Sequence, residues 1–150
     1  MKPLVDRTAT FPRKLTENIW VLGNYYFNLF LIQGSKGAAL VELGISAIVD
    51  SVIDQLTSLQ ISPSYLIMAH PHSDHVTGLM GLVESYPQSE LMTAKGAYDF
   101  IHHPKAAEAI VKEDAFMSQS MEKNGFRPGR DPIREMVLPK QSIIVEDCLK

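Results

Sequence analysis

The chain has 150 residues, of which 45% are hydrophobic, and a formal net charge of -3. This composition is typical of one globular domain with a hydrophobic core, and it includes no basic stripe that would bind nucleic acid. The single cysteine, Cys148, excludes an internal disulfide, and no stretch has the length and hydropathy of a signal peptide or a membrane span. We therefore expect one cytoplasmic domain over residues 1–150, with neither nucleic acid nor membrane as a partner.

Strand signals dominate the first 45 residues. Short apolar and aromatic runs, separated by glycine-containing turns, occupy residues 18–23, 25–32 and 37–43. These runs predict antiparallel strands. From Ser46 onward, apolar residues recur at helical spacing until Ser62-Pro63, which predicts an amphipathic helix.

Strand and helix signals then alternate along the chain. Residues 64–69 predict a buried strand, residues 76–86 a second helix and residues 90–94 another strand. This alternation is typical of a layered α/β domain.

The last third is predicted to be mainly helical. A short helix is expected over residues 97–103 and a longer one from Pro104 to about Asn124-Gly125, because proline suits the first turn of a helix and glycine ends one. A loop rich in proline and glycine follows. Residues 135–139 and 142–150 then predict two further strands, and the second of these reaches Lys150 without a closing turn.

Three of the five histidines lie within the six residues His70-Pro71-His72-Ser73-Asp74-His75. In an extended segment the side chains at i and i+2 point to the same side, so His70 and His72 can grip one metal ion. Pro71 favours that extended conformation for His70. Asp74 and His75 follow where the strand gives way to a helix, and a bend there can turn both toward a second metal.

A single histidine at the end of a strand is more often a hydrogen-bonded structural residue than a ligand. The spacing H-x-H-x-D-H changes that judgement. With this chain's histidine and aspartate frequencies it arises by accident with a probability on the order of a few in ten thousand. Metal binding is the better interpretation.

These residues resemble the H-x-H-x-D-H signature of the metallo-β-lactamase fold superfamily. The surroundings are similar too, with a hairpin, a strand that ends in Glu42-Leu43-Gly44, and a helix. The resemblance implies half of an αββα four-layer sandwich, in which a mixed, largely antiparallel sheet carries helices on one face and a helical insertion follows the motif. It also implies one or two metal ions, usually zinc and sometimes iron or manganese. By position, His70 and His72 would bind the first ion, and Asp74 and His75 the second.

The chain departs from the family pattern in two places. Glu42 stands where many members have aspartate, a residue that shapes the site without binding metal in most of them. The family's later metal ligands have no counterpart, because the two remaining histidines, His102 and His103, lie in a helical stretch and favour surface or helix-capping roles.

The resemblance implies hydrolysis of an ester, thioester, lactone or lactam in a small-molecule substrate. Zinc lowers the pKa of a bound water toward about 7 and so supplies hydroxide near neutral pH. Asp74 is the candidate catalytic residue, because it could orient that hydroxide or carry a proton to the leaving group. Two alternatives stay open: an iron-dependent oxidoreductase of the persulfide dioxygenase kind, and a non-catalytic half-domain.

Residues after the motif have two interpretations each. Phe116, Met117 and Met121 could form an apolar lid over the site, or could belong to the core. Three arginines of the following loop could bind an acidic group of the substrate, or could simply be solvated: Arg127, Arg130 and Arg134.

One sheet with helices on a single face leaves its other face uncovered, and large exposed apolar patches are rare on soluble monomers. We therefore expect the chain to be the N-terminal half of a longer metallo-hydrolase, or to pair with a second copy as a homodimer. Alone, it should bind metal weakly and turn over little substrate.

Overall fold

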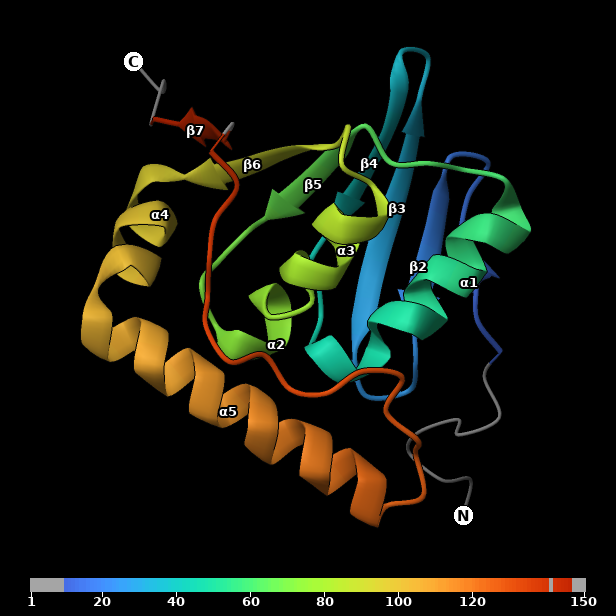
Figure 1. Ribbon diagram of the computed structural model, residues 1–150. Coiled ribbons are helices and arrows are strands. Elements are labelled where there is room, and N and C mark those ends of the chain that lie inside the picture. Colours follow the sequence, from blue (N-terminus) through green and yellow to red (C-terminus); the bar gives the residue numbers. More distant parts are fainter. Residues whose placement is uncertain (1–9, 141, 147–150) are drawn as a thin grey trace, which may run out of the picture.

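The computed structural model describes residues 10–140 and 142–146, and within these seven strands form one sheet in chain order (Figure 1). The strands are β1 (Arg13–Lys14), β2 (Ile19–Gly23), β3 (Asn28–Gly34), β4 (Gly37–Val41), β5 (Tyr65–Met68), β6 (Glu90–Ala94) and β7 (Ser142–Val145). Strands β1 to β4 pair antiparallel, and β4 to β7 pair parallel. The predicted mixed α/β sheet is confirmed, with antiparallel pairing confined to its first four strands.

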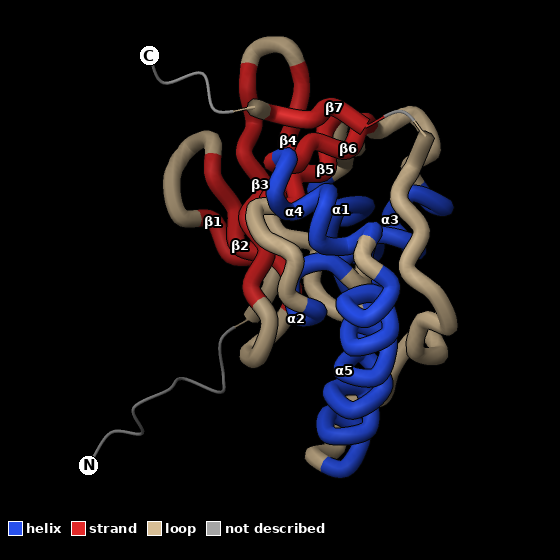
Figure 2. Tube along the Cα trace, turned by 90° about the vertical axis from the view of Figure 1, so that its left-hand side faces the viewer, coloured by secondary structure: helices blue, strands red, loops and turns tan. Residues whose placement is uncertain are grey.

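All the described helices lie to one side of this sheet (Figure 2). They are the 3-10 helix η1 (Ser46–Ile48), α1 (Val49–Leu59), α2 (Ser73–Val76), α3 (Leu79–Ser85), α4 (Lys95–His102) and α5 (Pro104–Lys123). Helix α5 runs along the lower edge of the molecule, past α2 (Figure 1). The predicted helical insertion after the motif is therefore present.

The core lies between the sheet and the helices, because strand side chains alternate between the two faces. One row of leucines crosses four neighbouring strands in register, and each is fully buried: Leu31, Leu40, Leu66 and Leu91. Helices α1 and α3 contribute Val52, Leu56 and Leu82 to the same core. This hydrophobic layer fixes the strand register.

The opposite face of the sheet is apolar and open to solvent in the described part of the chain. Phe30, Ile32 and Tyr65 are 38%, 42% and 37% exposed. Phe30 pairs with Val41 on β4, and Val41 pairs with Ile67 on β5. The expected single-sided arrangement is therefore observed, with an apolar face left uncovered.

The helix predicted over residues 76–86 corresponds to α3, which begins at Leu79 because a break at Thr77-Gly78 separates it from α2. Gly78 lies so close to β4's exit loop that a Cβ on it would be 2.0 Å from the carbonyl oxygen of Leu43. Its N–H donates to the Gly44 carbonyl at 3.0 Å. This close approach needs glycine at position 78, and it divides the helix.

The strand predicted over residues 135–139 is wrong. This segment has no strand pairing and instead runs back from α5 along the helices, with Met136 and Leu138 packed against the core. The place beside β6 is taken by β7, which confirms the first four residues of the strand predicted over residues 142–150. Cys148 lies outside the described residues. None of the described helices combines the length and hydropathy needed to cross a membrane.

Candidate metal centre

Two neighbouring parallel strands end at the candidate site. Val41 on β4 pairs with Ile67 on β5, so Glu42 just after β4 lies beside the segment that carries His70. The carboxyl ends of parallel strands are where open α/β sheets place their binding sites. The sheet topology thus brings together residues 28 positions apart in sequence.

Glu42 connects two of the motif histidines. Its Oε2 lies 2.7 Å from Nδ1 of His75, and its Oε1 lies 3.9 Å from Nδ1 of His70. One nitrogen or oxygen atom from each of the three residues can be chosen so that all lie within 4.8 Å of one another. These atoms are close enough together to hold a metal ion.

The other two motif residues flank this group. Oδ2 of Asp74 lies 3.1 Å from Nε2 of His75. The His72 ring packs edge-on against His70, with ring centroids 4.9 Å apart. Among the described residues, only Glu42, His70 and His75 form a group of three potential ligands, and Asp74 and His72 each contact one member of that group. The assignment of the four motif residues as ligands stays a prediction.

The local backbone explains why these side chains converge. His72 is extended, with φ -74° and ψ 145°, and α2 begins directly after it. Asp74 and His75 sit on this single helical turn, which is held against the β4 exit loop by the hydrogen bond from the Leu43 N–H to the His75 carbonyl at 3.0 Å. The strand-to-helix bend expected from the sequence is thus present.

Glu42 has a left-handed backbone conformation, with φ 66°. Such a conformation costs roughly 1–2 kcal/mol for a residue with a Cβ, and it persists only where surrounding contacts enforce it. The Glu42 N–H donates to the Ile67 carbonyl at 3.1 Å, and the carboxyl group meets His75. The sequence placed Glu42 at the site, but its contact with two histidines could not be read from the spacing.

The donor atoms suit a transition metal. Imidazole nitrogens and carboxylate oxygens are ordinary zinc ligands. The side chains of Glu42, His70 and His75 are 16%, 40% and 30% exposed, so solvent and a small molecule can reach the cluster. The residues present therefore fit a metal ion.

The two other histidines lie apart from this cluster. His102 Nδ1 is 2.8 Å from the Tyr98 carbonyl oxygen on α4, and its ring packs on Tyr98. His103 precedes α5 as its N-cap residue, without a side-chain capping hydrogen bond. Among the described residues, neither joins a group of three potential metal ligands. Their predicted capping or surface roles are consistent with these positions.

Helix α5 and the β2–β3 turn form a small apolar cleft of about 140 Å³. Phe116 and Met117 line it from α5, and Tyr26 and Phe27 from the turn. Phe116 is exposed, whereas Met121 is buried in the core. The expected lid residues are therefore divided between surface and interior.

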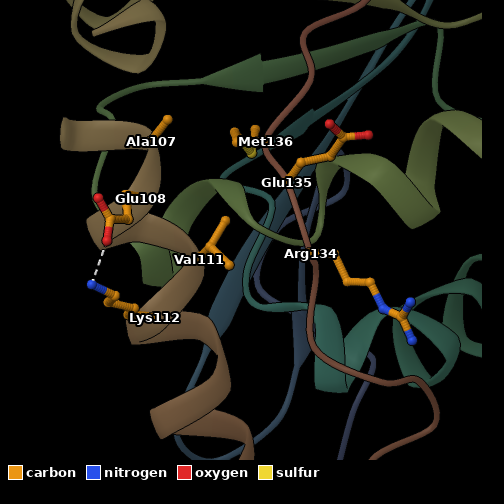
Figure 3. Close-up of a pocket in the computed structure, with 7 residues that line it drawn as sticks. All are labelled: Ala107, Glu108, Val111, Lys112, Arg134, Glu135 and Met136. Carbon is orange, nitrogen blue, oxygen red and sulfur yellow. Dashed lines mark hydrogen bonds and ion pairs between the residues drawn. The ribbon is translucent and has the colours of Figure 1, made fainter. Parts of the chain in front are cut away.

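A larger cleft of about 360 Å³ lies between the first half of α5 and the returning chain (Figure 3). Its lining residues are Ala107, Glu108, Val111, Lys112, Arg134, Glu135 and Met136. Lys112 is paired with Glu108, and the Arg134 side chain points away from α5 (Figure 3). Arg130 is engaged by Asp50 and Glu84, each at 2.7 Å.

Comparison with known proteins gives a consistent result. A family model described as the metallo-beta-lactamase superfamily matches residues 24–145. The curated hydroxyacylglutathione hydrolase of Buchnera aphidicola subsp. Baizongia pistaciae (strain Bp) is 31% identical over 65 residues, which are 43% of this chain and 24% of that protein.

Solved structures share the fold. A metallo-beta-lactamase HARLDQ-motif mutant from Cronobacter sakazakii matches with a TM-score of 0.57 and 17% identity, over 62% of this chain and 38% of that one. The subclass B3 metallo-beta-lactamase BJP-1 of Bradyrhizobium japonicum matches with a TM-score of 0.55 and 19% identity, over 63% and 37%. The chain thus spans well under half the length of these relatives.

Proposed function

Since the chain belongs to the metallo-beta-lactamase superfamily, we propose that it is the metal-binding half of a zinc-dependent hydrolase. We assign His70, His72, Asp74 and His75 as the metal ligands. The family match and the curated hydrolase relative support a metal-dependent hydrolase in general. The observation that carries the proposal is the convergence of Glu42, His70 and His75 at the carboxyl ends of β4 and β5.

Glu42 has a positioning role in this proposal. Its carboxyl group holds Nδ1 of His75 at 2.7 Å, which directs Nε2 toward Asp74. A carboxylate that holds one imidazole nitrogen fixes the tautomer and the ring orientation of a metal-binding histidine. Glu42 therefore prepares His75 for coordination through its other nitrogen.

Asp74 is assigned the proton-carrying role. When bound, zinc supplies an acidified water and polarises the bond to be cleaved. The Asp74 side chain is 42% exposed and adjoins His75, so its carboxylate can accept a proton and release it to a leaving group. Its partial exposure leaves it accessible to a substrate at the edge of the sheet.

The proposed substrate is a small molecule with an ester, thioester, lactone or lactam bond. The names of two relatives support a thioester and a lactam as the first substrates to be tested, since one is a hydroxyacylglutathione hydrolase and the other a metallo-beta-lactamase. The apolar cleft lined by Tyr26, Phe27 and Phe116 is a candidate site for an apolar part of the substrate. The proposed location of the protein is the cytoplasm, as expected from the sequence.

Chelation and metal replacement test the hydrolase assignment. Chelator-treated protein should hydrolyse a thioester no faster than buffer, and zinc should restore a slow, measurable rate. Asp74→Asn should abolish the restored rate, while His102→Ala, a histidine outside the cluster, should keep it. Equal hydrolysis with and without zinc would contradict the proposal. Iron as the metal that copurifies would favour the oxidoreductase alternative.

A further inference from the structure

The carboxyl group of Asp114, in the middle of α5, is fully buried. Four donors surround it. Oδ1 accepts from the Ser46 N–H at 3.1 Å and from the Thr77 hydroxyl at 2.6 Å. Oδ2 accepts from the Ser46 hydroxyl at 2.6 Å and from the Ile133 N–H at 2.9 Å. Burying a carboxyl group is costly unless donors compensate it, and here both oxygens have two.

These donors belong to three segments, two of which adjoin the candidate site. Ser46 begins η1, which follows the exit loop of β4, and Ile133 lies in the returning chain. Thr77 directly follows α2. Its hydroxyl has one proton and two acceptors nearby, Asp114 at 2.6 Å and the Ser73 carbonyl at 2.9 Å. The shorter contact, to a carboxyl oxygen, is the stronger one.

Helix α2 depends on such outside contacts because it is only four residues long. An isolated turn of helix is not stable in water. Helix α5 holds it at both ends: Glu113 accepts from the Ser73 hydroxyl at 2.5 Å, and Asp114 accepts from Thr77. Asp74 and His75, two of the proposed metal ligands, lie between these anchors.

We propose that Asp114 is a positioning residue for the metal centre, acting through Thr77 to fix the orientation of α2. This inference rests on the proposed metal site and assigns α5 a function at that site. Loss of the Thr77 contact leaves the end of α2 held by backbone hydrogen bonds to Leu43 and Gly44 but no longer by Asp114. Asp74 and His75 can then shift relative to Glu42 and His70. Metal affinity then falls by more than the loss of stability explains.

Three single variants separate positioning from simple stabilisation. Thr77→Val removes the hydroxyl at nearly constant shape, and Thr77→Ser restores it. Ser46→Ala is the matched control, because it removes another hydroxyl bound to Asp114 but leaves the contact with α2. For each variant, the dissociation constant for Co²⁺ is measured by visible absorption, stability by urea unfolding of the metal-free chain, and amide hydrogen exchange at His75, whose N–H donates to the His72 carbonyl.

We expect Thr77→Val to raise the dissociation constant for Co²⁺ about tenfold and to accelerate exchange at His75. Thr77→Ser should lie within about twofold of the unaltered chain, and Ser46→Ala should lose stability without either effect. Equal Co²⁺ affinity and equal exchange in Thr77→Val and Ser46→Ala would overturn the inference. If the unaltered chain takes up no Co²⁺, the proposed metal site fails, and exchange at His75 still decides whether Asp114 positions α2.

Discussion

At the scale of single residues, Glu42 combines backbone strain with the contacts of the candidate site. Its φ of 66° is unfavourable for a residue with a Cβ, yet it directs the carboxyl group to His75 and toward His70. Strained residues of this kind cluster at functional sites, where the strain contributes to pre-organisation. Glu42 therefore lowers the stability of the fold while it holds the histidines in place.

Replacement of Glu42 by glycine tests both effects, on stability and on the arrangement of the histidines. Glycine adopts the left-handed conformation without penalty, so Glu42→Gly should raise the free energy of unfolding of the metal-free chain or leave it unchanged, by about 0–1 kcal/mol. Zinc affinity should fall about tenfold or more, because His75 loses its partner. Urea unfolding and equilibrium dialysis measure the two effects.

Gln60 provides the matched control, because it has a similar φ of 57° at the end of α1, outside the cluster. Gln60→Gly should change stability in the same direction and leave zinc affinity unaltered. A Glu42→Gly chain with full zinc affinity would contradict the role of Glu42.

The sequence predicted which residues lie near one another better than it predicted their contacts. The H-x-H-x-D-H motif could be placed at the end of a strand because strand ends and turns are encoded locally, and the resemblance to the family placed Glu42 near it. The contact between Glu42 and His75 depends on the pairing of β4 with β5, which is separated by helix α1 in sequence. The role of Asp114 depends on how α5 packs, and one aspartate in an amphipathic helix gives no signal for that.

At the scale of elements, the returning chain after α5 fastens two helices. Arg130 donates through Nε to Asp50 on α1 and through Nη1 to Glu84 on α3. The hydrogen bond to Asp50 is the main reason that the pKa of Arg130 is raised above its ordinary value. The segment thus connects α1 to α3 through Arg130. Part of the same segment, residues 135–139, carries the strand prediction that is wrong.

Removal of this ion pair should destabilise the chain modestly. Arg130→Gln should lower the free energy of unfolding by about 1 kcal/mol, because the side chains are partly exposed and water screens the attraction. Urea unfolding should show a smaller difference at high salt. Arg127→Gln, at an exposed position of the same segment, should change stability by less than about 0.5 kcal/mol. Equal effects of the two variants on stability would argue against this connecting role of Arg130.

Local patterns explain which elements were predicted correctly. Short apolar runs in β2 to β6 and the periodic apolar residues of α1 and α5 indicated these elements. The break between α2 and α3 was missed because it arises from the contact of Gly78 with Leu43, which lies on a distant segment. Residues 135–139 have strand-like composition, but the edge beside β6 is occupied by β7.

At the scale of the whole molecule, the sheet has one covered and one open face. Leu31 and Ile32 are neighbours on β3, yet the first is 0% and the second 42% exposed. We propose that a second sheet, or a second copy of the chain, covers the open face. Both occupants would bury the same apolar residues.

Light scattering on the 150-residue chain alone tests whether the open face is covered by a partner, because only a second copy of the chain can then cover it. We expect a dimer or larger assembly at micromolar concentrations, and Phe30→Ser with Ile32→Ser should shift it toward a monomer. Leu31→Ala, on the covered face, should instead cost about 2–5 kcal/mol of stability. A stable, well-folded monomer of the unaltered chain would contradict the prediction that the open face needs a partner.

Zinc stoichiometry tests whether the motif residues bind the metal. Equilibrium dialysis followed by elemental analysis measures bound zinc per chain for the unaltered protein and for His72→Ala, Asp74→Ala and His102→Ala. We expect weak but saturable zinc binding that falls in His72→Ala and Asp74→Ala and is retained in His102→Ala. The same zinc content in all four proteins would show that the motif does not hold the metal.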